Sequence, residues 1–253
     1  MTTPANPTVH HFDVLIVGSG LAGLTAALTL APTHRVAILT KRDLIDGASS
    51  WAQGGIAAVL AEGDSIEKHI QDTLIAGAGL CDLDATRLVV EQAPHAIAWL
   101  QQMGVPFSRE DDHLHLTREG GHSERRIVHV TDATGAAVQH TLIGHVKNHP
   151  NITVLEQHTL VDLITGSKFG LAHDRCLGLY ALDGVTDEVL TFSAPHTILA
   201  TGGAGKVYLY TTTRTRPPAT VLPQLGGPGA GCKTWNSSSF IPPACITRML
   251  SRS

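Results

Sequence analysis

The sequence of 253 residues predicts an α/β protein with a Rossmann-like, three-layer fold around a parallel central sheet. The first observation is a short apolar, β-branched run, Phe12–Val17, typical of a strand buried on both faces. The glycine turn Gly18–Gly23 follows at once, and small and aliphatic residues then continue in a helical pattern over Leu21–Leu30. Arg35–Thr40 is typical of a second buried strand, which completes a βαβ unit.

Helical periodicity returns three times further along the chain. The predicted helices cover Ser65–Ala76, Asp84–Met103 and Gly135–Asn148, with Asp84 as the expected N-cap of the second and Gly104 directly after its end. Ala48–Val59 is a glycine- and serine-rich loop that enters an apolar segment. The polar segment Val105–Val130 predicts loops with short strands, a kind of segment that often carries function.

The later part of the chain favours strands. They are expected at Ile152–Glu156, Leu160–Ile164, Cys176–Leu182, Val189–Ser193 and Thr197–Ala200, the third and fourth forming a hairpin. The last of them runs into a second glycine turn, Thr201–Gly203.

Composition excludes several functional classes. A net charge of −4 gives no electrostatic reason to bind nucleic acid or an anionic membrane. No apolar run approaches the ~18–20 residues of a membrane span, and Met1–His11 lacks the pattern of a signal peptide, so a cytoplasmic location is expected. Four scattered cysteines indicate reduced thiols. His145 and His149 have ligand spacing but lack a third partner, so no metal is expected.

The first glycine turn fits the dinucleotide fingerprint G-x-G-x-x-G in its required place between strand and helix. Gly18 permits the tight turn, Gly20 lets the backbone approach a pyrophosphate, and Gly23 allows the helix to pack closely. The acidic residue expected after the second strand is replaced by Thr40-Lys41. The fingerprint alone therefore leaves NAD and FAD open.

Four further segments decide between these cofactors. They are Ser49–Ala57, Leu116–Ser123, Asp132–Gly135 and Ala200–Gly205. Together they resemble the flavoprotein family of L-aspartate oxidase, succinate dehydrogenase and fumarate reductase. The strings His115–Ser123, Ile75–Gly79 and Gly205–Thr211 are most similar to the L-aspartate oxidases. The resemblance covers roughly residues 10–212 and implies a FAD/NAD(P)-binding fold with FAD as cofactor.

By this resemblance, the FAD pyrophosphate lies over Ser19–Ala22, Lys41 lies near the ribose and phosphate, and the flavin lies against Ala48–Gly55. Dehydrogenase relatives carry the flavin covalently on a histidine of this loop; the matching residue here is Ala48, so the resemblance implies dissociable FAD. The implied cofactor-binding residues are Gly18, Ser19, Gly20, Leu21, Ala22, Gly23, Lys41, Ala48, Ser49, Ser50, Trp51, Ala52, Gln53, Gly54, Gly55, Val161, Ala200, Thr201 and Gly202.

On the substrate side the resemblance implies that Glu119 faces the amino group of L-aspartate, since a carboxylate binds an ammonium and repels a plain dicarboxylate. Thr117, Gly121 and His122 are supporting candidates. The implied reaction moves a hydride from Cα of L-aspartate to FAD, gives iminoaspartate, and is completed by O2 or fumarate. The product would feed quinolinate and NAD synthesis, with quinolinate synthase as a metabolic partner. A solvated charge cluster is the competing interpretation of the residues around Glu119.

From about Thr212 the composition changes, because residues 212–253 contain no Asp or Glu and six of the thirteen prolines. Lys233–Met249 can be encoded by a DNA sequence whose translation, started two bases later, is Asn-Leu-Glu-Phe-Ile-Gln-Phe-His-Pro-Thr-Cys-Leu-Tyr-His-Pro-His. This second translation resembles the sequence of the family. We therefore expect a frameshift near Thr212–Thr213. Sequencing the coding DNA tests it, since an intact reading frame would refute a frameshift.

The expected organisation is a flexible N-terminus (1–10), an incomplete FAD-binding domain (11–211) and an aberrant, disordered tail (212–253), without the capping and C-terminal helical domains of the family. The chain alone is then expected to turn over little L-aspartate. Two alternatives stay open, a soluble fumarate reductase or succinate dehydrogenase flavoprotein and a nucleotide-binding remnant without catalysis.

Overall fold

The computed structural model describes residues 8–131 and 133–203. The described residues divide into two compact units, of which the first holds residues 8–48 and 143–203 and the second holds residues 49–131 and 133–142. The predicted tail, the predicted frameshift and Asp132 of the third family segment lie outside the described residues.

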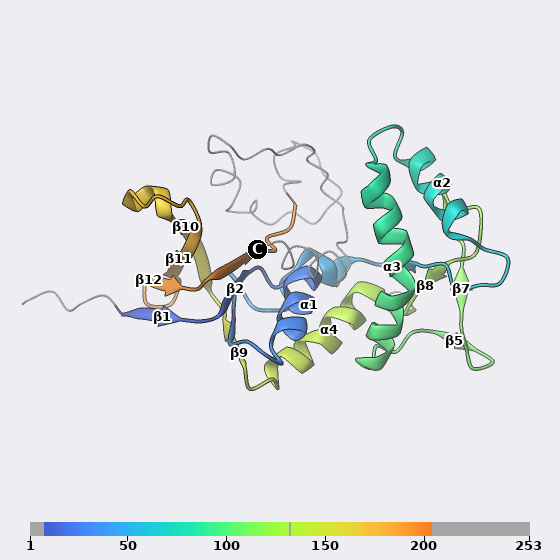
Figure 1. The fold of residues 1–253 in the computed structure, drawn as a ribbon. Helices are drawn as coiled ribbons and strands as arrows, with labels where there is room; N and C mark the ends of the chain where they lie inside the picture. Colours follow the sequence, from blue (N-terminus) through green and yellow to red (C-terminus); the bar gives the residue numbers. More distant parts are fainter. Residues whose placement is uncertain (1–7, 132, 204–253) are drawn as a thin grey trace, which may run out of the picture. The chain divides into compact units, whose positions relative to one another are not determined.

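The first unit is built on the parallel sheet that the sequence predicts (Figure 1). Its strand order is β13-β2-β3-β9, with β2 at Val14–Val17, β3 at Val36–Leu39, β9 at Ile152–Leu155 and β13 at His196–Leu199. All eight residues of β2 and β3 are buried, because both faces of these strands are covered. Helix α1, Leu21–Leu30, contacts β2 and β3.

A second, mostly antiparallel sheet covers the other face of the parallel sheet. Its order is β1-β12-β11-β10, with β1 at Val9–His11, β10 at His158–Thr165, β11 at Cys176–Asp183 and β12 at Glu188–Ser193; a short 3-10 helix, η2, covers Gly166–Phe169. Alternate residues of β2 and β3 join alternate residues of this sheet in one core: Leu15, Val17, Ala37, Leu39, Leu160, Leu179, Ala181, Phe192 and Ala194. Helix, parallel sheet and antiparallel sheet are thus the three predicted layers.

Strand β1 corrects the expectation of flexibility at residues 9 and 10 alone, since residues 1–7 lie outside the described part of the chain. Val9–His11 pairs in parallel with β12, and the ring of His10 stacks on Phe192 at 5.1 Å between centroids. A free strand edge offers backbone hydrogen bonds to any neighbouring extended segment, which a sequence pattern of three residues does not reveal.

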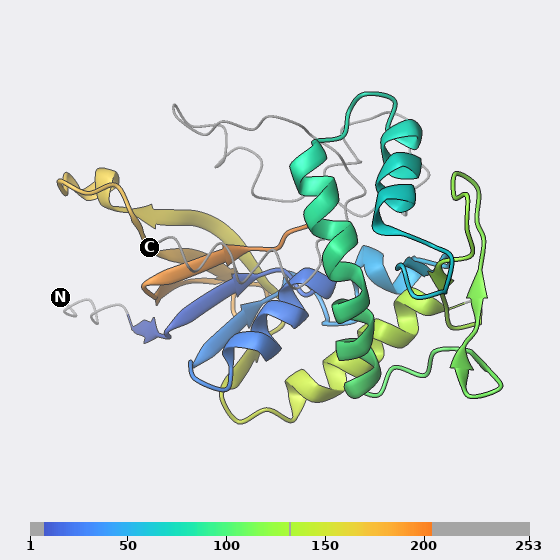
Figure 2. The ribbon, with the colours of Figure 1, turned by 45° about the vertical axis from the view of Figure 1, so that its right-hand side comes forward.

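The second unit contains helices and short strands. Figure 2 shows α2, Ile66–Ala76, beside α3, Leu83–Gln102. A small antiparallel sheet has the order β4-β8-β7, with β4 at Ile56–Ala57, β8 at Ile127–Val128 and β7 at Leu116–Thr117. A two-residue pair, β5 at Arg109–Glu110 and β6 at His113–Leu114, lies in the same polar segment. Helix α4, Thr134–Lys147, runs from this unit into the first.

The expected N-cap of α3 was wrong by two residues. Asp82 is the N-cap, and its carboxylate accepts a hydrogen bond from the backbone N–H of Ala85 at 2.9 Å. Asp84 instead lies in the first turn, where a negative charge is also favourable. Both aspartates suit a helix start, so the sequence did not distinguish them. Gly104 follows the helix with a positive φ of +92°, as predicted for that position.

Candidate functional site

The first βα turn requires glycine at two positions. Gly18 has a φ of +116°, and a Cβ there would lie 2.2 Å from the carbonyl oxygen of Ala200. A Cβ on Gly23 would lie 2.0 Å from the carbonyl oxygen of Gly18, so the helix packs directly on the turn. These are the tight turn and the close helix packing that the fingerprint predicts.

The N-terminus of α1 is suited to an anion. Its N-cap is Gly20, which has no side chain to accept a hydrogen bond from the first N–H groups, and the first turn has no acidic residue. Such N–H groups and the helix dipole attract a phosphate. The hydroxyl of Ser19 is buried and donates to Oγ1 of Thr40 at 3.0 Å, which ties the turn to the end of β3.

Three neighbouring parallel strands end beside one another at this turn. Gly18 follows β2, Thr40 and Lys41 follow β3, and Ala200 follows β13. The backbone N–H of Ala200 donates to the carbonyl oxygen of Val17 at 2.8 Å. Lys41 is half-buried. Its burial lowers its pKa, and the positive charge of the neighbouring Arg42 lowers the pKa further. Ligands of open α/β sheets bind at this carboxyl edge.

The remaining first-unit candidates differ in their support. Thr201 and Gly202 follow Ala200 after the end of β13, and Gly202 has a φ of +76°. Val161 lies in β10, where the register with β11 shifts between Leu160 and Asp162, so a bulge interrupts the ladder at this residue. Its side chain is 45% exposed.

In the second unit the small sheet brings a glycine pair next to a carboxylate. Gly54 and Gly55 precede β4, while Glu119 is the second residue after β7, and both strands pair with β8. The backbone N–H of Gly55 donates to Oε1 of Glu119 at 3.4 Å. A Cβ on Gly54 would lie 3.7 Å from both carboxylate oxygens. The loop predicted for the flavin and the residue predicted for the substrate are therefore direct neighbours.

The rest of this loop is held by the start of α4. Ser49, Ser50 and Trp51 form the 3-10 helix η1, Ala48–Trp51, and the backbone N–H of Gly135 donates to Ala52 at 3.0 Å. A Cβ on Gly135 would lie 2.0 Å from the carbonyl oxygen of Ser49. The residues Ala48, Trp51, Ala52, Gln53 and Gly54 are exposed.

The predicted charge cluster separates into two groups. Arg118, Glu119 and Arg125 are exposed, as the interpretation of a solvated cluster expects. Arg126 has no exposed surface at all and pairs with Asp64 and Asp72. Sequence analysis missed this buried cluster, because Arg126 lies 62 and 54 residues from its two partners and none of the three belongs to an apolar pattern.

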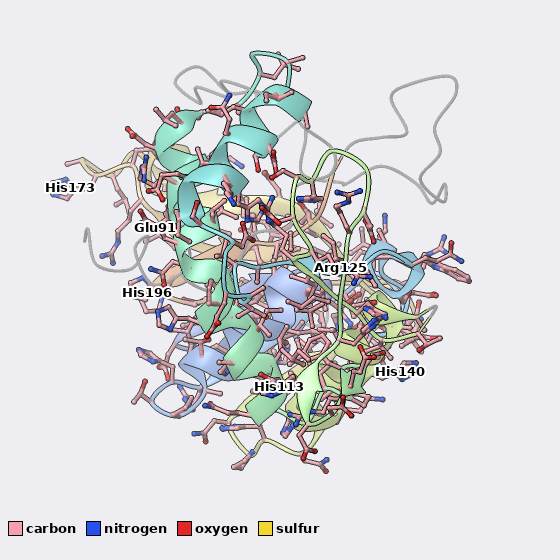
Figure 3. All side chains as sticks on the ribbon, turned by 90° about the vertical axis from the view of Figure 1, so that its right-hand side faces the viewer. Glu91, His113, Arg125, His140, His173 and His196 are labelled. Carbon is pink, nitrogen blue, oxygen red and sulfur yellow. The ribbon has the colours of Figure 1, made fainter. Side chains whose placement is uncertain are left out.

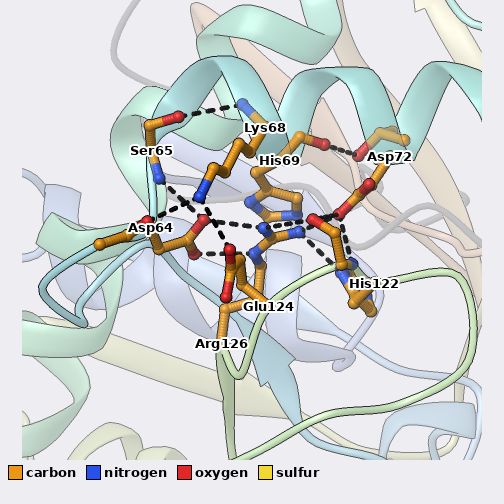
Figure 4. Close-up of polar contacts among 11 residues, drawn as sticks. Asp64, Ser65, Lys68, His69, Asp72, His122, Glu124 and Arg126 are labelled. Atoms are coloured by element: carbon orange, nitrogen blue, oxygen red, sulfur yellow. Dashed lines mark hydrogen bonds and ion pairs between the residues drawn. The ribbon is translucent and has the colours of Figure 1, made fainter.

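Figure 4 shows the buried charge cluster, defined here by Asp64, His69, Asp72, His122 and Arg126. The pKa of Asp72 is lowered to about 2. The largest cause is the hydrogen bond from the backbone N–H of Ser123, and the hydrogen bond from Arg126 adds to it. The bond from Arg126 also lowers the pKa of Asp64. The pKa of His69 is lowered to about 4, mainly by burial. The positive charge of Arg126 and the neighbouring His122 lower it further.

The supporting candidates lie in the segment that precedes Arg126 in the sequence. Thr117 is half-buried in β7, where it pairs with Ile127. Gly121 is exposed with a φ of +85°. His122 is half-buried, and its ring lies edge-on to that of His69 at 5.5 Å between centroids. Glu119, Gly121 and His122 thus belong to the loop that follows Thr117.

The histidines show no metal-like grouping within residues 8–131 and 133–203, where no three potential ligands come together. His113, His140, His173 and His196, labelled in Figure 3, are all exposed. His149 lies beyond the end of α4, and its Nδ1 accepts from the backbone N–H of Asn151 at 3.2 Å. None of the helices in the described part of the chain is long and apolar enough to cross a membrane.

Both the sequence and the fold of this chain are similar to those of known enzymes. L-aspartate oxidase 1 of Ralstonia nicotianae is 60% identical over 80% of the chain, and L-aspartate oxidase of Pseudomonas aeruginosa is 52% identical over 80%. The chain covers 38% and 39% of these relatives, so it spans about two fifths of their length. Quinol fumarate reductase FrdA of E. coli has a TM-score of 0.75 at 31% identity, over 80% of this chain and 34% of that one.

The family described as FAD binding domain matches residues 13–237. The match confirms the prediction of FAD as the cofactor and of a FAD-binding fold around the parallel sheet. It includes the glycine turn, the glycine pair and the loop that carries Glu119. The chain therefore belongs to the FAD binding domain family, and its sequence is similar to the corresponding part of L-aspartate oxidases.

Proposed function

We propose that this chain is the FAD-binding part of an enzyme that oxidises L-aspartate to iminoaspartate, with O2 or fumarate as the final electron acceptor. One observation carries the proposal: the carboxylate of Glu119 stands at the backbone N–H of Gly55, in the loop that the family resemblance assigns to the flavin. An ammonium group bound by this carboxylate would be held beside that loop. The product would supply quinolinate synthesis.

The residues of the first unit fit the phosphate part of FAD. The N–H groups at the start of α1 have no capping side chain, and Gly18 gives the turn its left-handed backbone. A pyrophosphate would complete the hydrogen bonding of that helix end. Lys41, at the end of β3, would add a positive charge on the ribose and phosphate side.

The glycine pair fits the ring of FAD. The flat isoalloxazine ring needs backbone at close range, and Gly54 has no side chain to keep it away. Ala48 has no nucleophilic atom, which supports a cofactor that is bound without a covalent bond. FAD supplies hydride acceptance, so the protein has to bind and orient the substrate.

The chain's own residues would recognise the amino acid. Glu119 would accept hydrogen bonds from the substrate ammonium, and His122 would donate one to a carboxylate of the substrate. Glu119 would also repel a dicarboxylate without an amino group, because two negative charges would face each other without compensation. The proposed preference is therefore for L-aspartate over succinate.

The cofactor proposal is tested by retention of flavin. Purified protein is incubated with excess FAD and passed through a desalting column, and bound flavin is measured at its visible absorbance. We expect the wild type to retain FAD, Gly18→Ala to lose it, and Gly104→Ala to keep it, although Gly104 also has a positive φ. Absence of flavin from folded wild-type protein would contradict the proposal.

The substrate proposal is tested on the FAD-loaded protein by flavin difference spectra. Addition of L-aspartate should perturb the flavin spectrum at concentrations at which succinate does not, and Glu119→Gln should remove this preference. A stronger response to succinate would favour the fumarate reductase or succinate dehydrogenase alternative. The similarity of the fold to FrdA is the observation in favour of that alternative. A flavin that responds to neither would favour a nucleotide-binding protein without catalysis.

A further inference from the structure

The strongest unexplained feature of the molecule is the guanidinium of Arg126. Arg126 has no exposed surface and directly precedes β8. Its backbone carbonyl oxygen accepts a hydrogen bond at 2.9 Å from the backbone N–H of Ala58, the residue after β4. Charged side chains are seldom fully buried unless they are paired. The pairing of Arg126 therefore shows what this charge holds together.

Asp64 binds the guanidinium as a fork. Nε of Arg126 donates to Oδ2 at 2.9 Å and Nη2 donates to Oδ1 at 2.8 Å, while the side chain of Asp64 is only 1% exposed. Such two-point pairing fixes the plane of the guanidinium and not only its position. Asp64 directly precedes Ser65, the N-cap of α2, so Arg126 is fixed to the start of that helix.

Asp72, two turns further along α2, connects the same helix to the loop. Its Oδ2 accepts from Nη1 of Arg126, from the backbone N–H of Ser123 at 2.7 Å and from the hydroxyl of Ser123 at 2.8 Å. The loop that ends at Arg126 is thus tied to α2 at two points three residues apart. Its other end is fixed by the pairing of Thr117 with Ile127.

The guanidinium also determines the state of His122. Nη1 of Arg126 lies 3.3 Å from Nδ1 of His122. Because a guanidinium only donates hydrogen bonds, Nδ1 has to accept, and the ring proton is then on Nε2. A neutral imidazole in this tautomer is a hydrogen-bond donor at Nε2.

We propose that Arg126, held by Asp64 and Asp72, is a positioning residue that fixes the loop from Thr117 to Ser123, so that Glu119 stays at Gly55 and His122 presents its Nε2 proton to the substrate. This inference rests on the proposed function and assigns a role to residues that do not touch the substrate. A purely structural role would instead predict a loss of stability with no selective effect on this loop or on amino-acid recognition.

The first test needs no cofactor and measures hydrogen–deuterium exchange of the purified chain. Arg126→Lys keeps the charge but loses the fork, and Lys68→Gln removes an exposed ion pair, Lys68 to Glu124 at 2.8 Å, between the same helix and loop. In Arg126→Lys we expect exchange at least tenfold faster in residues 117–123 and 53–57, with α3 unchanged. Lys68→Gln should match the wild type.

Equal acceleration in α3 and in the loop would overturn the proposal in favour of a general structural role, as would no acceleration in either. If Arg126→Lys does not fold, Asp72→Asn gives the same decision. It leaves the fork to Asp64 in place and removes the charge that holds Ser123. We expect the same selective acceleration in residues 117–123.

The second test is a double-mutant cycle in FAD-loaded protein, with L-aspartate affinity measured by the flavin difference spectrum. Arg126→Lys should weaken L-aspartate binding at least tenfold in the wild type but by a smaller factor in the Glu119→Gln background, because the part of its effect that acts through Glu119 is then already lost. Equal losses in both backgrounds would overturn the proposal. If wild-type protein binds no FAD, the proposed function fails, while the exchange test still decides on the role of Arg126.

Discussion

Replacement of His69 by glutamine should remove a pH dependence from the stability of the second unit. His69 lies in α2 with 6% of its surface exposed, and its Nδ1 has no hydrogen-bond partner within the described residues. Burial, Arg126 and His122 lower its pKa to about 4, although Asp64 and Asp72 act in the opposite direction. An unfolded histidine has a pKa of about 6.5.

The sign follows from proton counting. Between pH 6.5 and about 4 the unfolded chain binds a proton at His69 and the folded chain does not, so the free energy of unfolding falls as the pH is lowered through this range. A tenfold change in proton affinity corresponds to about 1.4 kcal/mol. The loss attributable to His69 is therefore about 2 kcal/mol at pH 5 and about 3 kcal/mol at pH 4.

The assay is urea unfolding at several pH values from 7 to 4, monitored by circular dichroism and by tryptophan fluorescence. The quantity of interest is the difference in free energy of unfolding between the wild type and His69→Gln. This difference removes the contributions of all groups that titrate alike in both proteins. We expect it to move by about 2 kcal/mol between pH 7 and pH 5, in favour of the variant.

A control variant is His140→Gln, because His140 is an exposed residue of α4. Its difference from the wild type should stay constant over the same range. If the His69→Gln difference also stays constant within about 0.5 kcal/mol, a scale on which surface substitutions vary, His69 is not held neutral by the fold. The description of the buried charge cluster would then be wrong.

Three further substitutions test other parts of the structure. Gly18→Ala should lower stability by about 1–3 kcal/mol or more in urea unfolding, because its Cβ would lie 2.2 Å from a carbonyl oxygen and its φ is +116°. Gly55→Ala should lower the melting temperature while Gly54→Ala leaves it nearly unchanged, since the first Cβ would lie 2.4 Å from β8 and the second 3.7 Å from a flexible carboxylate. In Asp72→Asn the free energy of unfolding should depend less on pH between pH 4 and 2 than it does in the wild type. The wild-type carboxylate, with its pKa lowered to about 2, contributes stability that is lost as the pH falls through that value. An equal pH dependence in both proteins would contradict this.

Local patterns predicted the elements whose stability is local. The βαβ unit was identified because the buried strands of Val14–Val17 and Val36–Leu39 are continuously apolar and the turn between strand and helix needs glycine. The start of α2 was also identified, since Ser65 caps it by accepting from the N–H of Lys68. The start of α3 was misplaced because Asp82 and Asp84 both suit a helix N-terminus and only the backbone geometry selects one.

The site divides in the same way. Glycine positions follow from backbone geometry, which a motif records, so Gly18 and Gly23 were predicted for the reason that the structure confirms. Glu119 came from the family resemblance, and its proximity to Gly55 depends on the pairing of β4, β8 and β7. The buried state of Arg126 had no local signal, because its partners are 62 and 54 residues away in the sequence.

The cost of such a charge favours a role beyond stability. A buried ion pair is often replaceable by apolar residues without loss of stability, whereas removing one partner leaves a charge that is expensive to bury. Leucine or methionine at position 126 would therefore stabilise the fold about as well as Arg126. Arg126 differs because it sets the orientation of the loop: its two bonds to Asp64 fix the plane of the guanidinium, and its third nitrogen binds Asp72. Direction is what a loop with Gly120 and Gly121 lacks by itself, since glycines leave the backbone free. The burial of Arg126 therefore fits the proposed role, in which it holds Glu119 and His122 in one orientation.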